Sequence, residues 1–286
     1  MHGRCGFEDL HFGTAGIPLS VKKRDTEDGV RAVSELGLSA MELEFVRGVR
    51  MGEEKADAVR EVATTEGVIL TAHGPYYINL NSKEEEKRQA SIERIISTAI
   101  VGKRCGAFSI TFHPAYYQKD SHELVYSKVR DALLDIVDVL SVEENDVWVR
   151  PETTGKPSQF GSLEEIISLS EEIEQVLPCI DFSHLHARDG KHNTYEEFME
   201  ILGMVEEKLG KGAIRCMHCH VQGINYSSKG ELNHLNLRES DFRYVDLLRA
   251  FIEFDVAGVV ICESPNIEKD ALLLKDTYTR LLETES

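Results

Sequence analysis

Metal-binding side chains occur at the ends of successive apolar segments of this chain. These side chains are His73, His113, Glu152, Asp181, His218 and Glu263. Imidazole nitrogen and carboxylate oxygen are suitable ligands for zinc, manganese or iron. A lone histidine is more often a satisfied or exposed side chain, but six segments in a row that end in this way indicate a metal site.

More candidate ligands lie close by in the sequence. His184 comes three residues after Asp181, and Glu231 and His234 lie downstream of His218. The nine residues together are too many for one zinc ion, which normally takes about four ligands. The set therefore predicts two or three ions. Ions about 3.5–4 Å apart are typical of enzymes that hydrolyse phosphoesters.

Eight candidate strands would position these ligands. They are residues 10–13, 39–45, 68–73, 108–113, 147–152, 178–182, 214–218 and 258–263. Segments with apolar residues at helical spacing lie between or after them, at 83–104, 122–140, 163–176, 194–208, 241–254 and 268–282. Strands that alternate with helices in this way predict a parallel sheet.

Eight such units predict an α/β fold, the (β/α)8 TIM barrel, which needs about 250 residues. The carboxyl ends of all strands meet at one face of such a barrel, where catalytic groups gather. No linker or shift in composition marks a boundary, so we expect residues 1–286 to form a single domain. The alternative is a doubly wound open sheet, but Phe12–Gly16 (FGTAG) is a poor match to the glycine-rich phosphate loop of such sheets.

Charge and composition exclude several classes of protein. The chain has 32 Lys and Arg against 50 Asp and Glu, a net charge of −18 at pH 7. This charge disfavours binding of nucleic acid over the whole surface, although bound cations or a local basic rim would still attract phosphate. No apolar run reaches about 18 residues and the first residues lack a secretion signal, so we expect a cytoplasmic protein with no membrane span. We also expect it to be a monomer. The six cysteines, scattered from Cys5 to Cys262, are typical of reduced thiols.

A series of short motifs runs through the chain. They are His73–Leu80 (HGPYYINL), Phe112–Pro114 (FHP), Pro151–Gly155 (PETTG) with Gly161–Ser162, Ile180–His184 (IDFSH), Met217–His218 and Ile261–Pro265 (ICESP). In this order they resemble the endonuclease IV family of apurinic/apyrimidinic-site nucleases, within the xylose isomerase-like barrels. The resemblance covers about residues 10 to 265.

The resemblance implies a trinuclear zinc centre, with Mn²⁺ as an alternative metal. His73, His113 and Glu152 would hold one ion, Glu152 would bridge to a second held by Asp181, His218 and Glu263, and His184, Glu231 and His234 would hold a third. Two departures from the family pattern concern the later motifs. The family usually shows Asp-x-His where this chain has Glu231-Leu232-Asn233-His234, and Asn-Asp where Cys219–Gly223 (CHVQG) follows His218.

The implied reaction is hydrolysis of the phosphodiester 5′ to an abasic site in double-stranded DNA, by water that the ions activate. Glu152 and Glu263 are the predicted catalytic residues. Glu152 would bridge two ions, and Glu263 would orient or deprotonate the attacking water.

Four residues near the predicted strand ends are candidate substrate contacts. Arg47 and Arg50 follow the second strand and would form a local positive loop, although a solvated surface explains them equally well. Tyr76 and Tyr77 follow His73, and the resemblance implies that their loop wedges into duplex DNA at the lesion. Packing against a neighbouring loop is the alternative for both tyrosines.

Two further residues share a strand face with predicted site residues. His220 lies on the face of His218 and is an alternative ligand or a group behind the ligands. Glu44 ends the second strand and is a supplementary ligand or a substrate contact.

Two other functions fit the same residues. A sugar isomerase or epimerase of the xylose isomerase-like class would act on a small sugar or sugar phosphate with one divalent ion. Glu152, Asp181, His218 and Glu263 would hold that ion, and the remaining histidines would contact the sugar. The other is a metal-binding barrel that has lost catalysis and serves as a binding module.

Overall fold

The computed structural model describes residues 6–285, and eight parallel strands form its central sheet. The strands are β1 (Leu10–Ala15), β2 (Ala40–Glu44), β3 (Ile69–His73), β4 (Ser109–Phe112), β6 (Trp148–Pro151), β8 (Ile180–Asp181), β9 (Met217–Val221) and β12 (Gly258–Cys262). Their order in the sheet is β6-β4-β3-β2-β1-β12-β9-β8. All eight predicted strands are therefore present.

Hydrogen bonds between β6 and the segment leading into β8 join the two ends of this order. Cys179 N donates to the carbonyl oxygen of Pro151 at 3.2 Å, and Thr153 N donates to the carbonyl oxygen of Cys179 at 3.1 Å. The sheet is thus closed into a cylinder. The predicted (β/α)8 barrel is confirmed and the doubly wound open sheet is excluded.

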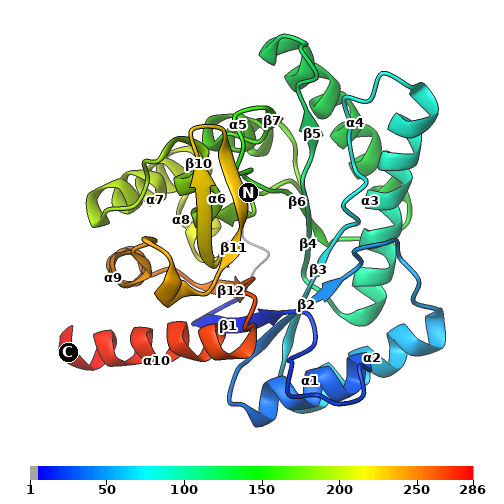
Figure 1. The fold of residues 1–286 in the computed structure, drawn as a ribbon. Coiled ribbons are helices and arrows are strands. Elements are labelled where there is room, and N and C mark those ends of the chain that lie inside the picture. The colour runs from blue at the N-terminus through cyan, green and yellow to red at the C-terminus, as the bar shows by residue number, and fades with distance from the viewer. Residues whose placement is uncertain (1–5, 286) are drawn as a thin grey trace.

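Helices surround the strands, as Figure 1 shows. They are α1 (Thr26–Glu35), α2 (Glu53–Glu66), α3 (Glu85–Cys105), α4 (His122–Val142), α5 (Leu163–Glu172), α7 (Tyr195–Leu209), α9 (Tyr244–Glu253) and α10 (Glu268–Glu285). Six of these correspond to the predicted helical segments, and α1 and α2 fill the first two βα connections.

Local sequence signals explain where several helices begin and end. The hydroxyls of Ser162 and Thr194 cap α5 and α7, and Glu165 and Glu197 complete a capping box in each. Gly67 ends α2 with a φ of 67°, a left-handed backbone that glycine adopts without steric cost.

Shorter helices and strands lie outside the eight-stranded sheet. They are α6 (Phe182–Asp189), α8 (Lys211–Ile214), the 3₁₀ turn Leu237–Glu239, the pair β5 (Ala115–Tyr116) and β7 (Gln159–Phe160), and the hairpin β10 (Gly223–Ser227) and β11 (Gly230–Leu235). The hairpin packs against α6 (Figure 1), the helix that directly follows β8.

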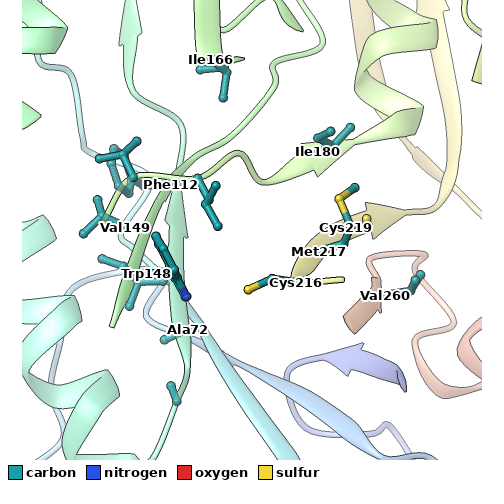
Figure 2. Packing of buried hydrophobic residues seen from close by; sticks show 14 of the residues in the cluster. Ala72, Phe112, Trp148, Val149, Ile166, Ile180, Cys216, Met217, Cys219 and Val260 are labelled. Atoms are coloured by element: carbon teal, nitrogen blue, oxygen red, sulfur yellow. The ribbon is translucent and has the colours of Figure 1, made fainter. Parts of the chain in front are cut away.

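Apolar side chains fill the layer between strands and helices. Figure 2 shows Val149 of β6, Ile180 of β8 and Val260 of β12 in the same buried cluster as Ile166 of α5. Each fully buried aliphatic side chain of this kind contributes about 1.5–3 kcal/mol to folding. The core therefore holds the strand ends, and the residues that follow them, in fixed positions.

Arg150 occupies the interior of the barrel and is only 1% exposed. Its guanidinium donates to the carbonyl oxygens of Pro178 at 2.8 Å and Cys216 at 2.6 Å and lies near the rings of Phe108 and Trp148. Burial lowers the pKa of Arg150 to about 10. The side chain fills space below Glu152, which lies two residues further on and faces the same side of the strand.

The cysteines test the prediction of reduced thiols, and the helices test the prediction that no segment spans a membrane. Cys105, Cys179, Cys219 and Cys262 are buried free thiols. Cys216 is disulfide-bonded, so the prediction of reduced thiols is wrong at that residue, and Cys5 lies outside the described residues. Within the described part of the chain, every helix is too short or too polar to cross a lipid bilayer.

Candidate metal centre

The predicted ligands gather at the carboxyl ends of the strands. His73 is the last residue of β3, Asp181 ends β8, and His113, Glu152 and Glu263 directly follow β4, β6 and β12. Because all eight strands run parallel around a closed sheet, these five side chains project at the same end of the barrel.

Glu152 lies at the centre of the first group. Its Oε2 atom lies 3.2 Å from Nε2 of His73, and its Oε1 atom lies 3.2 Å from Nε2 of His113. Ligand atoms of these three residues all lie within 4.8 Å of one another. Glu152 and His73 are buried, whereas the His113 side chain keeps 30% of its exposure. The group matches the set predicted for the first ion.

A second group shares Glu152 with the first. It consists of Glu152, Asp181, His220 and Glu263, with ligand atoms within 4.8 Å of one another. Nδ1 of His220 lies 3.5 Å from Glu152 Oε1 and 3.6 Å from Glu263 Oε1. The backbone N–H of His184 and the side-chain amide of Gln222 donate to the two oxygens of Asp181 and fix its orientation.

The structure brings His220, and not His218, to the second group. The predicted strand 214–218 made His218 the last strand residue, but α8 occupies the first part of that segment and β9 spans Met217–Val221. His218 therefore pairs in register with Val259, one pleat below His220, which pairs with Ile261. Its Nε2 atom faces Glu42 at 2.9 Å and its Nδ1 atom faces Ser109 at 2.7 Å.

The third group consists of His184, Glu231 and His234, as predicted. His184 lies in the first turn of α6, and the two other residues lie in β11. Nε2 of His184 lies 3.7 Å from Glu231 Oε2, and Nε2 of His234 lies 3.8 Å from Glu231 Oε1.

A bulge in the hairpin explains how Glu231 and His234 reach the same face. Residues three apart in a regular strand point to opposite faces. Here Asn225 pairs with Asn233 but Tyr226 pairs with Glu231, which leaves Leu232 as the extra residue of a bulge. Glu231 and His234 therefore share a face although one more residue separates them than in the Asp-x-His pattern. The extra residue, Leu232, is 57% exposed.

Backbone carbonyl groups orient three of the imidazoles. Nδ1 of His73 lies 2.7 Å from Gly74 O, Nδ1 of His184 lies 3.1 Å from Thr153 O, and Nδ1 of His234 lies 3.2 Å from Glu263 O. A carbonyl oxygen only accepts, so each Nδ1 carries a proton and each Nε2 presents a lone pair. This arrangement is common behind metal-binding histidines.

The buried polar atoms fit bound cations. Among the described residues, Glu152 Oε1, His184 Nε2 and both ring nitrogens of His220 are buried and make no hydrogen bond. Leaving such atoms unsatisfied costs free energy. At His73 the Nε2 lone pair faces a carboxylate, which requires a proton or a cation between them. Imidazole nitrogens and carboxylate oxygens are the ligands that zinc and manganese accept.

The pKa shifts of Glu152 and His73 are also consistent with a bound cation. Burial favours the protonated form of Glu152, but the imidazoles of His113 and His220 hold its pKa well below the usual value. Burial also opposes a charge on His73, yet Glu152 raises the pKa of His73 to about 10. Glu152 is thus a carboxylate that attracts positive charge into a buried site.

Two glutamates of β2 lie beside the second group. Glu42 is fully buried, and ligand oxygens of Glu42, Glu44 and Glu263 lie within 4.8 Å of one another. Burial, reinforced by the charges of Glu42 and Glu263, raises the pKa of Glu44 to about 8. The sequence indicated Glu44 as a supplementary group, and its strand-end position was the signal.

The predicted substrate contacts lie outside the three groups. Tyr76 and Tyr77 are 61% and 67% exposed, and the Tyr76 ring centroid lies 6.0 Å from that of His73. Arg47 and Arg50 are exposed in the loop after β2, and Tyr76 N donates to Val46 O in the same loop. The tyrosines line an open cavity of about 660 Å³, together with Lys83, Lys87 and Arg94.

The sequence of this chain is similar to one family model and to several known proteins. The family model described as xylose isomerase-like TIM barrel matches residues 30–281. The uncharacterized protein MJ0133 of Methanocaldococcus jannaschii is 48% identical over 273 residues, which cover 95% of this chain and 98% of that protein. A probable endonuclease 4 of Methanosphaera stadtmanae is 26% identical over 245 residues, or 79% of this chain and 82% of its own.

Similar solved structures include nucleases and sugar epimerases. Endonuclease IV from Thermus thermophilus has a TM-score of 0.76 at 17% identity and covers 96% of this chain and 99% of its own. A D-tagatose 3-epimerase-like protein has a TM-score of 0.74 at 18% identity and covers 96% of this chain and 97% of its own. At these identities the likeness shows the fold alone. The family model, by contrast, matches most of the sequence, and this chain therefore belongs to the xylose isomerase-like TIM barrel family.

Proposed function

We propose that this protein is a metal-dependent phosphodiesterase that cleaves double-stranded DNA on the 5′ side of an abasic site. The observation that carries the proposal is the set of three adjoining groups of imidazoles and carboxylates, two of which share Glu152. Several adjacent cations suit phosphodiester hydrolysis, whereas one ion is enough for sugar isomerisation. Sequence similarity to the probable endonuclease 4 of Methanosphaera stadtmanae supports the same function.

Each of the three groups would supply the ligands of one metal ion. His73, His113 and Glu152 would hold one ion, Glu152, Asp181, His220 and Glu263 a second, and His184, Glu231 and His234 a third. We propose zinc as the metal, with manganese as the alternative. The ions would supply Lewis acidity, which lowers the pKa of water and stabilises charge on phosphate oxygens.

The protein's own groups would perform two tasks. Glu152 belongs to both the first and the second group and would therefore fix their separation. The Glu263 side chain keeps 14% of its exposure, and solvent can reach it from the mouth of the barrel. We assign to Glu263 the orientation of the attacking water and the acceptance of its proton.

The surface around the site favours a substrate with phosphates and bases. Tyr76 offers an exposed aromatic ring beside His73, and the exposed Tyr77 follows it. Lys83, Lys87 and Arg94 line the adjoining cavity, where Glu84 offsets part of their charge. Such rings can wedge into a duplex or stack on bases, and the cations can contact the backbone. These local features would offset the net charge of −18.

We further propose that residues 1–286 form one domain that acts as a monomer. The strands of the single barrel are drawn from Leu10 to Cys262, so the site requires nearly the whole chain.

A sugar isomerase or epimerase is the second candidate. Glu152, Asp181, His220 and Glu263 form a complete four-ligand group without the other two groups. In such an enzyme the two glutamates would also shuttle protons next to the sugar carbonyl. The D-tagatose 3-epimerase-like structure shows that the same fold occurs in a protein named for sugar chemistry.

Metal analysis and one cleavage assay separate these functions. The full-length protein is loaded with Zn²⁺ or Mn²⁺, its ions per chain are measured, and it is incubated with a labelled duplex that contains one abasic site. Undamaged duplex is the control. Two or three ions and incision 5′ to the lesion support the nuclease. One ion, an intact abasic duplex and epimerisation of a ketose would replace the proposal by the sugar enzyme. Duplex binding without incision would favour a binding module.

A further inference from the structure

We infer that Glu42 is a positioning residue that sets the tautomer of His220 and aims its Nδ1 lone pair at the second metal group. The inference rests on the metal centre of the proposed function and does not depend on which substrate is cleaved.

Glu42 lies in the barrel interior behind His220. Its Oε1 atom lies 3.0 Å from Nε2 of His220, and its Oε2 atom lies 2.9 Å from Nε2 of His218. The hydroxyl of Thr71 donates to Oε2 at 2.7 Å. Glu42, His218 and His220 are all fully buried, so water does not compete for these contacts. One carboxylate therefore faces three potential donors.

The opposite side of the His220 ring faces the metal group. Nδ1 lies 3.5 Å from Glu152 Oε1 and 3.6 Å from Glu263 Oε1. A carboxylate at Nε2 favours the proton on that nitrogen. The lone pair is then left on Nδ1, where a cation shared with Glu152 and Glu263 would lie.

His220 differs in this respect from three other predicted ligands. Backbone carbonyls of Gly74, Thr153 and Glu263 orient His73, His184 and His234 through their Nδ1 atoms. Glu42 plays the corresponding part for His220 from the other side of the ring. Because it is a side chain and not backbone, its contribution can be removed by mutation.

Glu42→Gln is the test substitution because it keeps the size of the side chain. An amide carries no negative charge and has one acceptor oxygen where the carboxylate has two, so Nε2 of His220 would face a weaker acceptor or an N–H group. We expect the affinity for one Zn²⁺ ion to fall about 10–100-fold, the range found when an outer partner of a metal-binding histidine is lost. Competition with a zinc chelator measures this affinity, and Glu42→Asp should recover part of it.

Ser109→Ala is the matched control. It removes a contact of 2.7 Å with the far side of His218 but leaves Glu42 and His220 intact. Its zinc affinity should equal that of the wild type. Equal losses in Glu42→Gln and Ser109→Ala, or unchanged zinc affinity in Glu42→Gln, would overturn the inference.

A spectroscopic measurement keeps the inference testable if Glu42→Gln does not fold. Long-range ¹H–¹⁵N spectra of histidine-labelled, zinc-loaded wild-type protein show which nitrogen of His220 carries the proton. A proton on Nε2 supports the proposed orientation of the His220 ring, with Nδ1 toward the metal group, and a proton on Nδ1 contradicts the inference. The His220 signals are assigned by their absence in His220→Gln.

Failure of this inference can be distinguished from failure of the nuclease function. Wild-type protein that leaves abasic duplex intact, with weaker zinc binding in Glu42→Gln, would refute only the nuclease. Wild-type protein that incises the duplex, with unchanged zinc binding in Glu42→Gln, would refute only the role of Glu42.

Discussion

His218 and His220 lie on the same face of β9 with ring centroids 5.2 Å apart, and only His220 reaches the carboxylates at the mouth of the barrel. The two imidazoles contact different oxygens of Glu42. One pleat of the strand therefore separates a candidate metal ligand from a group buried beneath it.

Substitution of the two histidines should give opposite results. His220→Gln is expected to lose one bound ion per chain, because the second group loses a ligand. His218→Gln is expected to keep the wild-type number of ions, because its amide can still contact Ser109 and Glu42. Elemental analysis after removal of free metal measures both. Loss of an ion in His218→Gln alone would show that the sequence-based assignment was right.

Glu152→Gln should disable the first and second groups together. The variant removes a buried carboxylate that lies 3.2 Å from both His73 and His113. We expect the affinity for metal to fall by more than about 100-fold, beyond the effect of losing an outer partner. Incision of abasic duplex should become undetectable. Full metal content with wild-type incision would refute the bridging role of Glu152.

Tyr76→Ala and Tyr77→Ala should weaken substrate binding without changing metal content. Both rings are mostly exposed, so the free energy of unfolding should change by less than about 0.5 kcal/mol. Loss of one aromatic contact with a base costs about 1–3 kcal/mol, or roughly 5–150-fold in affinity. Binding of abasic duplex is measured at fixed salt. Leu19→Ala, at an exposed site, is the control, and an effect of the same size there would argue against a specific role.

The raised pKa of Glu44 predicts that the free energy of unfolding of the metal-free protein depends on pH. This pKa is raised from 4.5 to about 8 in the folded state, so between these values the folded protein holds a proton that the unfolded chain has lost. Wild-type stability should therefore fall relative to Glu44→Gln as the pH rises from 4.5 to 8, and the difference should then level off. Urea unfolding in the presence of a chelator at several pH values measures this. A difference that does not change with pH would contradict the raised pKa.

The capping box of α7 predicts a second effect of pH on the free energy of unfolding, with the opposite sign. Glu197 accepts hydrogen bonds from the backbone N–H groups of Asn193 and Thr194, and these lower its pKa to about 2. Glu197→Ala should cost about 1 kcal/mol of stability at neutral pH. The cost should shrink as the pH falls from 4.5 toward 2, because the wild-type carboxyl becomes protonated. Glu196→Ala, an exposed neighbour, should show no such trend in urea unfolding.

The sequence determined the barrel and most of the centre because both depend on short-range patterns. Apolar runs bury strands, and the first polar residue after each run must lie at the carboxyl end of the sheet. His73, His113, Glu152, Asp181 and Glu263 were all predictable from that rule, and the structure places them together.

Tertiary structure decided the parts that depend on register. The segment before β9 forms α8, which packs beside α7. The strand therefore begins and ends later than predicted, and this exchanges His218 for His220. The bulge at Leu232 arises from pairing between β10 and β11, and it alone puts Glu231 and His234 on one face. A shift of one residue along a strand reverses the direction of a side chain, and a shift of two moves it one pleat along the same face. Only the contacts of the folded chain fix either shift.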